Sequence, residues 1–413
     1  MQRRRPPKRR NRKAELRELT IDSLGSDGEG RAGGLSVPFA LPGEKVVAEV
    51  TGRRGVVRER SATSPARAQP LCPHFGLPGD GCGGCTLQHL GASLAQELKE
   101  RRLLDSVRTV FPDAVLAGVH TSPPRSRRRA KFSVTVEAAG FKQLAGRRVV
   151  PLEECAVLHP DLFALLRPLR GLARSLGTGF QAEATLAANG TDLALRTEGL
   201  EVGPSELATL SAYAEEHDLA RLALDGLPVS ERRAPFVEFG GVPVSLPPGS
   251  FLQATDAGEK ALQREVLTAC KGAGRVADLF SGLGTFALPL AGGAEVIAAD
   301  SEGSATDALS LAARRAGLPV TTEARDLYRR PLQAKELAVD AVVFDPPRAG
   351  AGEQAAEIAK ARPGTVLAVS CNPQRLARDL RHFAATYDLT RLVLVDQFGW
   401  SPHIEGVAVL KRR

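Results

Sequence analysis

The sequence has no apolar run approaching the roughly 18 residues that a membrane-spanning helix needs. No secretory leader is visible, and six cysteines are few and unevenly spaced for a chain of 413 residues. These features argue against a membrane protein and against a secreted protein held together by disulfide bonds. An apolar content of 43% and a charged content of 25% are typical of a globular protein. We therefore expect a cytoplasmic protein of two or three domains.

Net positive charge is confined to the N-terminus. The chain has 55 basic and 47 acidic residues, and eight of the basic residues fall in the first 13 positions, which contain no acid. The remaining chain is neutral, so the sequence pI of 9.4 mainly describes a basic tail at residues 1–15. Such a tail attracts polyanions. It suits a solvated extension and an RNA-binding arm equally well.

Two segments precede the C-terminal part of the chain. Residues 16–65 contain five short predicted strands with glycine turns between them. This pattern suits an OB-like β-barrel, a frequent nucleic-acid binder, and also a generic β module. Residues 66–245 mix a Pro/Gly/Cys loop, an amphipathic helix and strands, and we interpret them as a central α+β domain. Within it, Asn189-Gly190 between alternating runs predicts a β-hairpin.

A predicted strand near residue 130 begins with a cluster of basic residues. The cluster comprises Arg125, Arg127, Arg128, Arg129 and Lys131. Clustered arginine at a strand edge suits contact with RNA phosphates. It also suits a charged edge strand that resists aggregation. The motifs further along the chain favour RNA.

From about residue 246 onward, strands and helices alternate, which predicts an α/β domain with a doubly wound parallel sheet. Its first turn lies in DLFSGLGTF (278–286). This turn lacks the Lys-Ser/Thr of a phosphate loop and the GxGxxG spacing of a dinucleotide site. Gly282 and Gly284 would still let the backbone approach a ligand closely.

Three acids follow successive predicted strands of this domain: Asp300, Asp326 and Asp345. Each acid alone suits a helix cap or a loop. With the glycine turn they suit a nucleotide-type cofactor, because an acid at a strand end can bind ribose hydroxyls or reach an adenine amino group. The combination indicates S-adenosylmethionine.

Five motifs stand in order along the chain: SFLQATDAGE, DLFSGLGTF, FDPPRAG, VSCNPQRLARDL and SPHIEGVAVL. They resemble the ordered motifs of the RNA uracil-5-methyltransferase family, and residues 16–65 resemble the TRAM domain that many members carry. The resemblance implies a class I (Rossmann-like) methyltransferase domain at 246–413. By motif match it implies six cofactor-binding residues: Gln253, Phe280, Thr285, Asp300, Asp326 and Asp345. Thr285 and Asp300 stand where relatives often have Asn and Glu.

Cys371 follows the apolar run TVLAVS, where a buried strand would meet a loop. Carbon 5 of uracil attacks a methylsulfonium only after a thiolate has added to carbon 6, and a base must then remove the carbon-5 proton. The resemblance implies Cys371 as the nucleophile and Glu405, in SPHIE, as the base. We expect Cys371 in an electropositive or helix-N-terminal setting that favours the thiolate.

Four further cysteines form a candidate metal site: Cys72, Cys82, Cys85 and Cys155. The CxxC pair within this set is compatible with zinc and with an iron–sulfur cluster. Three grouped cysteines and one distant cysteine favour a [4Fe–4S] cluster, which some members of the resembled family carry. The gap between the first two cysteines is longer than in those members, and we interpret LPGD within it as a loop bulge. Cys270 suits a plain buried thiol.

Together these patterns predict an RNA (uracil-5-)-methyltransferase that forms 5-methyluridine, with 23S ribosomal RNA as the favoured substrate. The alternatives are the same chemistry on transfer RNA and a non-catalytic RNA-binding assembly factor. Arg348 in DPPR stands where amino-group methyltransferases carry an aromatic residue, which favours the uracil-5 reaction. We expect a monomer that binds RNA and no membrane, with a structural and RNA-positioning role for the cysteine cluster.

Overall fold

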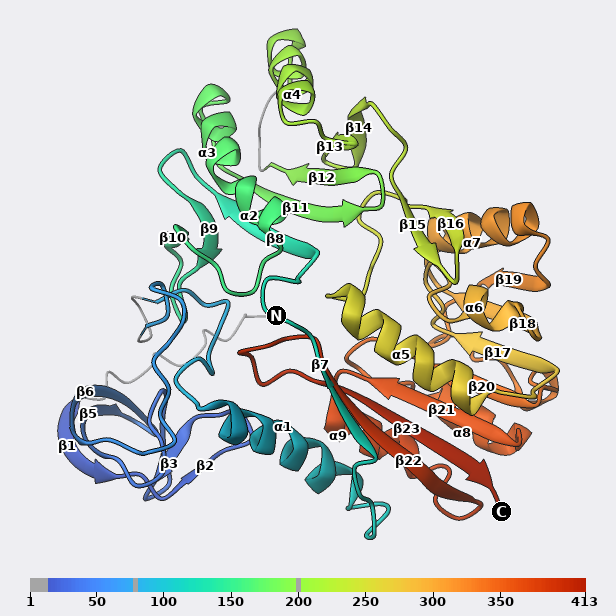
Figure 1. Ribbon diagram of the computed structural model, residues 1–413, viewed down its shortest axis with the longest axis horizontal. Helices are drawn as coiled ribbons and strands as arrows, with labels where there is room; N and C mark the ends of the chain where they lie inside the picture. Colours follow the sequence, from blue (N-terminus) through green and yellow to red (C-terminus); the bar gives the residue numbers. More distant parts are fainter. Residues whose placement is uncertain (1–13, 77–80, 198–201) are drawn as a thin grey trace, which may run out of the picture.

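The structure, a computed structural model, describes residues 14–76, 81–197 and 202–413. The predicted basic tail up to residue 13 and the predicted LPGD bulge at 77–80 lie outside the described residues. Three large sheets and one separate hairpin organise the described chain (Figure 1).

The first sheet lies in the N-terminal module. Its strands are β1 (Glu15–Thr20), β2 (Ser23–Leu24), β3 (Gly30–Ala32), β4 (Leu35–Val37), β5 (Lys45–Thr51) and β6 (Arg54–Ala62), in the order β1-β5-β6-β4-β3-β2. Alternate residues of β5, Val46, Ala48 and Val50, are buried in an apolar cluster with Val37 and Val57. This is the period-2 pattern of a strand with one buried face. Six strands stand where the sequence predicted five.

The second sheet lies in the middle of the chain. Its strands are β8 (Arg129–Val134), β9 (Ala139–Lys142), β10 (Val149–Pro151), β11 (Phe180–Ala187), β12 (Gly190–Arg196), β13 (Arg221–Leu224) and β14 (Leu227–Glu231), in the order β10-β9-β8-β11-β12-β13-β14. Three helices accompany it: α2 (Pro160–Ala164), α3 (Leu166–Ser175) and α4 (Pro204–Glu216). Leucines of these helices share one core with the sheet. The predicted hairpin is confirmed, because β11 and β12 pair up to Ala187 and Gly190.

The third sheet has eight strands. They are β7 (Gly118–Thr121), β17 (Arg275–Leu279), β18 (Glu295–Asp300), β19 (Val320–Ala324), β20 (Ala341–Phe344), β21 (Thr365–Ser370), β22 (Tyr387–Asp396) and β23 (Glu405–Arg412), in the order β19-β18-β17-β20-β21-β23-β22-β7. The predicted α/β class is confirmed, but the sheet is not wholly parallel. Strand β23 runs antiparallel to both neighbours. It follows β22 through a loop without a crossover helix, and such a connection can only reverse the chain direction.

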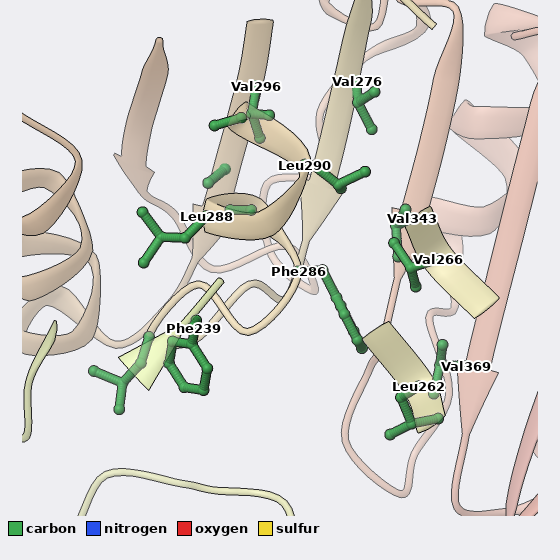
Figure 2. Packing of buried hydrophobic residues seen from close by; sticks show 14 of the residues in the cluster. Phe239, Leu262, Val266, Val276, Phe286, Leu288, Leu290, Val296, Val343 and Val369 are labelled. Carbon is green, nitrogen blue, oxygen red and sulfur yellow. The ribbon is translucent and has the colours of Figure 1, made fainter. Parts of the chain in front are cut away.

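Helices cover both faces of this sheet. They are α5 (Asp256–Ala269), α6 (Ala287–Ala291) and α7 (Gly303–Ala316) on one face, with the β15 (Phe236–Phe239) and β16 (Val242–Ser245) hairpin, and α1 (Ala92–Val107), α8 (Glu353–Ala361) and α9 (Pro373–Leu380) on the other. The short 3-10 helix η1 (Ala334–Glu336) precedes β20. Figure 2 shows the first face, where Val266 of α5 lies beside Val343 and Leu262 of α5 beside Val369; Leu288 and Leu290 of α6 belong to the same apolar cluster. Burial on both faces explains why the central strands are continuous apolar runs.

Helix α1 and strand β7 come from an early part of the chain, yet they belong to the third sheet. Strand β7 pairs with β22 in parallel, and Leu103 and Val107 of α1 lie in the core of the sheet. The middle sheet is therefore inserted between β7 and β17. The predicted central domain, 66–245, therefore includes α1 and β7, which the structure packs with the strands and helices of the C-terminal part of the chain.

A buried ion pair fixes α1 to the end of β22. Lys99 and Asp396 are 2% and 7% exposed, and Lys99 Nζ lies 2.5 Å from Asp396 Oδ2. Lys99 also donates to the carbonyl oxygen of Gly399. The loop between β22 and β23 is thereby held against α1 at its first residues. Removing one partner of such a pair leaves a buried charge without compensation.

We predict that Lys99→Met lowers the free energy of unfolding by roughly 3–5 kcal/mol. The measurement is a urea titration followed by the fluorescence of Trp400, the single tryptophan, which lies in the same loop. The matched control is Lys260→Met, because the exposed pair of Lys260 and Asp256 contributes less than about 1 kcal/mol. Equal midpoints for the two variants would contradict the prediction.

Candidate active site

One cavity of about 650 Å³ lies at the edge of the third sheet where its parallel strands end. It collects seven of the eight predicted catalytic and cofactor residues: Gln253, Phe280, Asp300, Asp326, Asp345, Cys371 and Glu405. The eighth, Thr285, does not line it. The main-chain oxygen of Thr285 instead accepts a hydrogen bond from Gln263 Nε2 at 3.1 Å.

Strand order brings Cys371 and Glu405 together. Cys371 directly follows β21, whereas Glu405 is the first residue of β23. Because the two strands are antiparallel neighbours, the start of β23 lies beside the end of β21, and Ser370 pairs with Gly406. The thiol and the carboxyl group therefore face the same cavity, although 33 other residues separate them in sequence.

Residues of the glycine turn after β17 line the cavity. Phe280 and Gly282 both have positive φ, 62° and 51°, and Gly282 lines the cavity with open space at its missing Cβ. Gly284 has a different role, because a Cβ there would lie 2.4 Å from Leu309 Cδ1 of α7. Only Gly282 therefore meets the expectation of a close backbone approach to a ligand.

Two of the predicted cofactor acids also shape their own turns. Asp300 accepts from the main-chain N–H of Gly282 at 2.9 Å and of Glu302 at 2.8 Å. Asp326 accepts from the main-chain N–H of Tyr328 at 3.0 Å and of Arg329 at 3.2 Å. The loop role and the ligand role, which the sequence left as alternatives, are compatible, because an ionised carboxylate has about four acceptor sites. Both acids line the cavity while holding the backbone around it.

A chain of side-chain hydrogen bonds crosses the cavity wall. Gln253 Nε2 donates to Asp345 Oδ2 at 3.1 Å, and Gln397 Nε2 donates to Gln253 Oε1 at 2.7 Å. Burial raises the pKa of Asp345 to about 7, although the hydrogen bond from Gln253 opposes this shift. The Asp345 carboxyl group is therefore harder to ionise than a solvated one.

The thiol of Cys371 is only partly in the predicted setting. It precedes α9, whose N-cap Asn372 accepts from the main-chain N–H of Gln374 at 3.1 Å, so the helix N-terminus is present. Burial nevertheless raises the pKa of Cys371 to about 11, with further increases from the charges of Glu405 and Asp345. The charge of Arg348 and its hydrogen bond to the thiol oppose the shift. The surroundings of the free thiol thus favour its protonated form.

Glu405 is 6% exposed and carries a similarly shifted carboxyl group. Burial raises its pKa well above the usual range, and the charge of Asp345 adds to this. A hydrogen bond with Gln397 and the charge of Arg348 act in the opposite direction.

The basic cluster divides into two groups. Arg125 and Lys131 are exposed, as phosphate contact requires. Arg128 instead forms an ion pair with the buried Glu259 of α5 and donates through Nε to the main-chain oxygen of Gln253 at 3.2 Å. The predicted phosphate contact is therefore wrong for Arg128, because its charge is already neutralised inside the protein. Three members of the cluster line the cavity that holds Cys371 and Glu405: Arg127, Arg129 and Lys131.

Several cavity residues were not assigned from the sequence. Phe251 is 61% exposed, with the Arg129 guanidinium 5.6 Å from its ring centre. The Tyr328 ring lies 5.7 Å from that of Phe280. Phe251 and Arg348 could have been assigned from the sequence, because they lie within the motifs SFLQ and DPPR. Gln397 carried no signal, since its environment depends on how the β22–β23 loop folds.

The four cysteines of the candidate metal site also converge. Cys72, Cys82, Cys85 and Cys155 line a second cavity of about 380 Å³. Main-chain N–H groups of Gly84 and Leu158 lie 3.4 Å and 3.5 Å from the sulfur atoms of Cys82 and Cys155. Burial raises the pKa of Cys85 to about 12. In the part of the chain that the structure describes, no three His, Cys, Asp or Glu side chains form a group that could hold one metal ion.

The two cavities share a wall. The shared lining residues are Arg127, Ala130, Lys131, Arg348 and Phe398. The loop between β22 and β23 also contacts the cysteine segment, because the main-chain N–H groups of Thr86 and Leu87 donate to the oxygen of Trp400 at 2.9 Å each. The cysteine site therefore borders the loop that leads to Glu405.

Comparison with known proteins identifies the family. The family described as tRNA (Uracil-5-)-methyltransferase matches residues 319–413. A protein of Rhizobium meliloti (strain 1021) named as an uncharacterized RNA methyltransferase is 40% identical over 95% of this chain and 99% of its own length. The 23S rRNA (uracil(1939)-C(5))-methyltransferase RlmD of Shewanella amazonensis is 33% identical over 98% of this chain and 97% of its own. The chain belongs to the RNA uracil-5-methyltransferase family. The family resemblance drawn from the five motifs is confirmed.

As a member of this family, the chain is an S-adenosylmethionine-dependent RNA (uracil-5-)-methyltransferase. A solved structure shares its fold: the tRNA (uracil-54, C5)-methyltransferase of Pyrococcus abyssi in complex with S-adenosyl-L-homocysteine. The two align with a TM-score of 0.75 over 95% of this chain and 100% of that chain, at 23% identity. Among the residues that the structure describes, no helix is both long and apolar enough to span a membrane.

Proposed function

We propose that this enzyme methylates carbon 5 of a uridine in 23S ribosomal RNA through a transient covalent bond between Cys371 and the pyrimidine. The observation that carries the proposal is the convergence of Cys371 and Glu405 with the predicted cofactor residues on one cavity. A non-catalytic assembly factor would not require a buried carboxyl group beside a thiol. Burying a carboxyl group beside a thiol destabilises the charged forms of both, and such arrangements cluster at catalytic sites.

The reaction begins with the Cys371 thiolate. Its sulfur bonds to carbon 6 of the uracil, and the electrons of the carbon 5–carbon 6 double bond move to form an enolate. S-adenosylmethionine would supply the methyl group as an electrophile: carbon 5 of the enolate bonds to the methyl carbon, whose bond to the sulfonium sulfur breaks, leaving S-adenosylhomocysteine. Glu405 then accepts the proton of carbon 5, the electron pair of that C–H bond restores the double bond, and the carbon 6–sulfur bond breaks to release the thiolate.

Arg348 supports the first step. Its guanidinium hydrogen-bonds to the Cys371 thiol and is the positive charge that opposes the raised pKa of that thiol. Glu405 and Asp345 both oppose ionisation of the thiol when they are charged. Arg348 is therefore the group that favours the thiolate, whereas charged carboxyl groups beside it disfavour the thiolate.

The covalent mechanism predicts opposite behaviour for two substitutions. Cys371→Ala abolishes methylation and leaves the affinity for RNA within a few-fold, because the sulfur is needed for chemistry alone. Glu405→Gln permits attack and methyl transfer but not proton removal, so a protein–RNA adduct accumulates. A denaturing gel with labelled RNA measures the adduct, and Cys270→Ala, which alters a thiol of the core, is the control. Turnover by Cys371→Ala would overturn the mechanism.

The proposed cofactor residues are Gln253, Phe280, Asp300, Asp326 and Asp345. Acids at the ends of β18 and β19 suit the ribose hydroxyls and the adenine amino group. Thr285, proposed from the motif match alone, lies outside the cavity lining.

We predict that Asp300→Asn weakens binding of S-adenosylmethionine at least tenfold, because a charge-assisted hydrogen bond contributes about 1.5–3 kcal/mol. Thr285→Val is the matched control and leaves the dissociation constant within about twofold. Calorimetric titration of each variant with S-adenosylmethionine measures both effects. Equal losses in the two variants would refute the placement of the cofactor.

The preference for ribosomal RNA has support from the relative of Shewanella amazonensis, which acts on 23S rRNA by its name and matches nearly the whole chain. The N-terminal sheet, proposed as a TRAM-type OB-like module, and the exposed Arg125 and Lys131 would contact phosphates. These contacts offset the few kcal/mol needed to take the uridine out of its stack. We propose a monomer acting in the cytoplasm. Mass-spectrometric mapping of RNA from cells lacking the enzyme distinguishes ribosomal from transfer RNA.

We further propose that Cys72, Cys82, Cys85 and Cys155 hold a [4Fe–4S] cluster. Two observations support the proposal: four thiols line one cavity, and main-chain N–H groups lie near two of the sulfurs. One zinc ion would draw four sulfurs to within about 2.3 Å of a single point, whereas the cluster spreads its ligands over a larger body. The cluster would fix the cysteine segment against the loop that leads to Glu405.

The cluster proposal predicts iron and acid-labile sulfide in protein purified without oxygen. Cys85→Ser should lose most of both, since one of the four ligands is gone, while Cys270→Ser should retain them. Metal analysis and visible absorbance measure the outcome. Stoichiometric zinc without iron or sulfide would contradict the cluster proposal and support a zinc site instead.

A further inference from the structure

Gln397 lies at the centre of the catalytic cavity wall and has no role in the mechanism so far. It follows the last residue of β22 and is 3% exposed. Its Nε2 donates to Gln253 Oε1 at 2.7 Å, and its Oε1 accepts from the main-chain N–H of Thr255 at 3.4 Å. Gln397 lines the same cavity as Glu405, two residues beyond Val395, which pairs with Glu405 across β22 and β23. A hydrogen bond with Gln397 lowers the pKa of Glu405.

The orientation of this amide is determined by Thr255. A main-chain N–H can only donate, so the atom of Gln397 that faces it must be the oxygen. Nε2 then donates one N–H to Gln253 and has its second N–H available for Glu405. Gln253 must in turn present its own oxygen to Gln397, which leaves its NH₂ group for Asp345. One backbone contact thus orients both amides.

The result is a directed chain that ends in a carboxyl group on each side. Glu405 receives one N–H bond from Gln397, and Asp345 receives one from Gln253. A carboxamide carries no net charge, so it stabilises an ionised carboxylate without a permanent ion pair that would block proton transfer.

Packing keeps Gln397 in place from both sides. A Cβ at Gly258 of α5 would lie 2.9 Å from Gln397 Cβ, so α5 approaches the residue closely. The preceding residue, Asp396, is held by Lys99 and accepts from the main-chain N–H of Phe398 at 3.1 Å. Gln397 therefore has little freedom to leave Glu405 during the reaction.

We infer that Gln397 is a positioning residue for Glu405, which holds that carboxylate aimed at the reacting carbon and in its ionised form. The inference rests on the proposed function, in which Glu405 removes the carbon-5 proton. The ionisable groups that act on Glu405 are Asp345, Cys371 and Arg348. The negative charge of Asp345 and burial both disfavour the carboxylate, so the amide and Arg348 are the groups that counter them.

The test is Gln397→Met, which keeps the length of the side chain and removes its hydrogen bonds. The ionised form of Glu405 loses a donor, so its pKa rises and the acidic limb of the pH–rate profile moves upward by about one pH unit. Below the midpoint, release of tritium from RNA labelled at carbon 5 of uracil falls about tenfold. Adduct formation in a single turnover stays near the wild-type rate, and the adduct accumulates at neutral pH.

The matched control is Gln354→Met. Gln354 is also fully buried, and its amide bonds to the main chain of Leu332 at 2.8 Å and 3.1 Å, remote from the cavity lining. This variant loses a comparable amide and should keep the wild-type pH profile. A second variant, Gln397→Glu, is nearly isosteric and keeps an acceptor for Thr255. It should shift the limb further, because it adds a negative charge.

The outcomes separate the two levels of the proposal. If both Gln397 variants keep the wild-type pH profile while Glu405→Gln still traps an adduct, Gln397 has no positioning role and the mechanism stands. If Glu405→Gln traps no adduct, the proposed function fails first. Equal shifts in the Gln397 and Gln354 variants would indicate general destabilisation and overturn the inference.

Discussion

The antiparallel pairing of β21 with β23 is the constraint on which the site depends. In a fully parallel sheet, the start of the last strand would lie at the edge opposite to the ends of its neighbours. Reversal of β23 brings its first residue, Glu405, beside Cys371. A hairpin-type connection from β22 enforces that reversal, and the same loop carries Gln397. The chemistry of the cavity therefore follows from the direction of one strand.

The cavity brings three acidic groups together in a buried site, and burial disfavours their charged forms. Asp345, Glu405 and Cys371 all have raised pKa values from burial, and their charges oppose one another. Arg348 is the cationic group named for both the thiol and Glu405. Burial and mutual repulsion therefore favour the protonated form of each of these groups. The amide chain from Gln253 to Gln397 stabilises the carboxylates without adding a charge.

Most of the site residues predicted from the sequence meet at one cavity, but the sequence did not indicate all of the contacts between them. Asp300, Asp345 and Cys371 were predictable, because each follows an apolar run and parallel strands end at one edge. The place of Glu405 came from the motif resemblance, since spacing alone does not reveal that β23 reverses. Arg128 could not be separated from its basic neighbours, because its partner Glu259 lies 131 positions away. Thr285 was predicted from the motif match alone, and it does not line the cavity. Gln397 was missed for a related reason, because its partners Gln253 and Thr255 lie 144 and 142 positions away in sequence.

The insertion of the middle sheet between β7 and β17 has a consequence for synthesis on the ribosome. Helix α1 and strand β7 emerge early, yet the surfaces that they cover, on β22 and α9, are made last. The apolar side chains of Leu103 and Val107 therefore lack their native packing partners until nearly three hundred further residues have been translated. For the same reason, a fragment that begins at β17 would lack β7 and leave the edge of β22 unpaired, where a strand of another chain could pair with it.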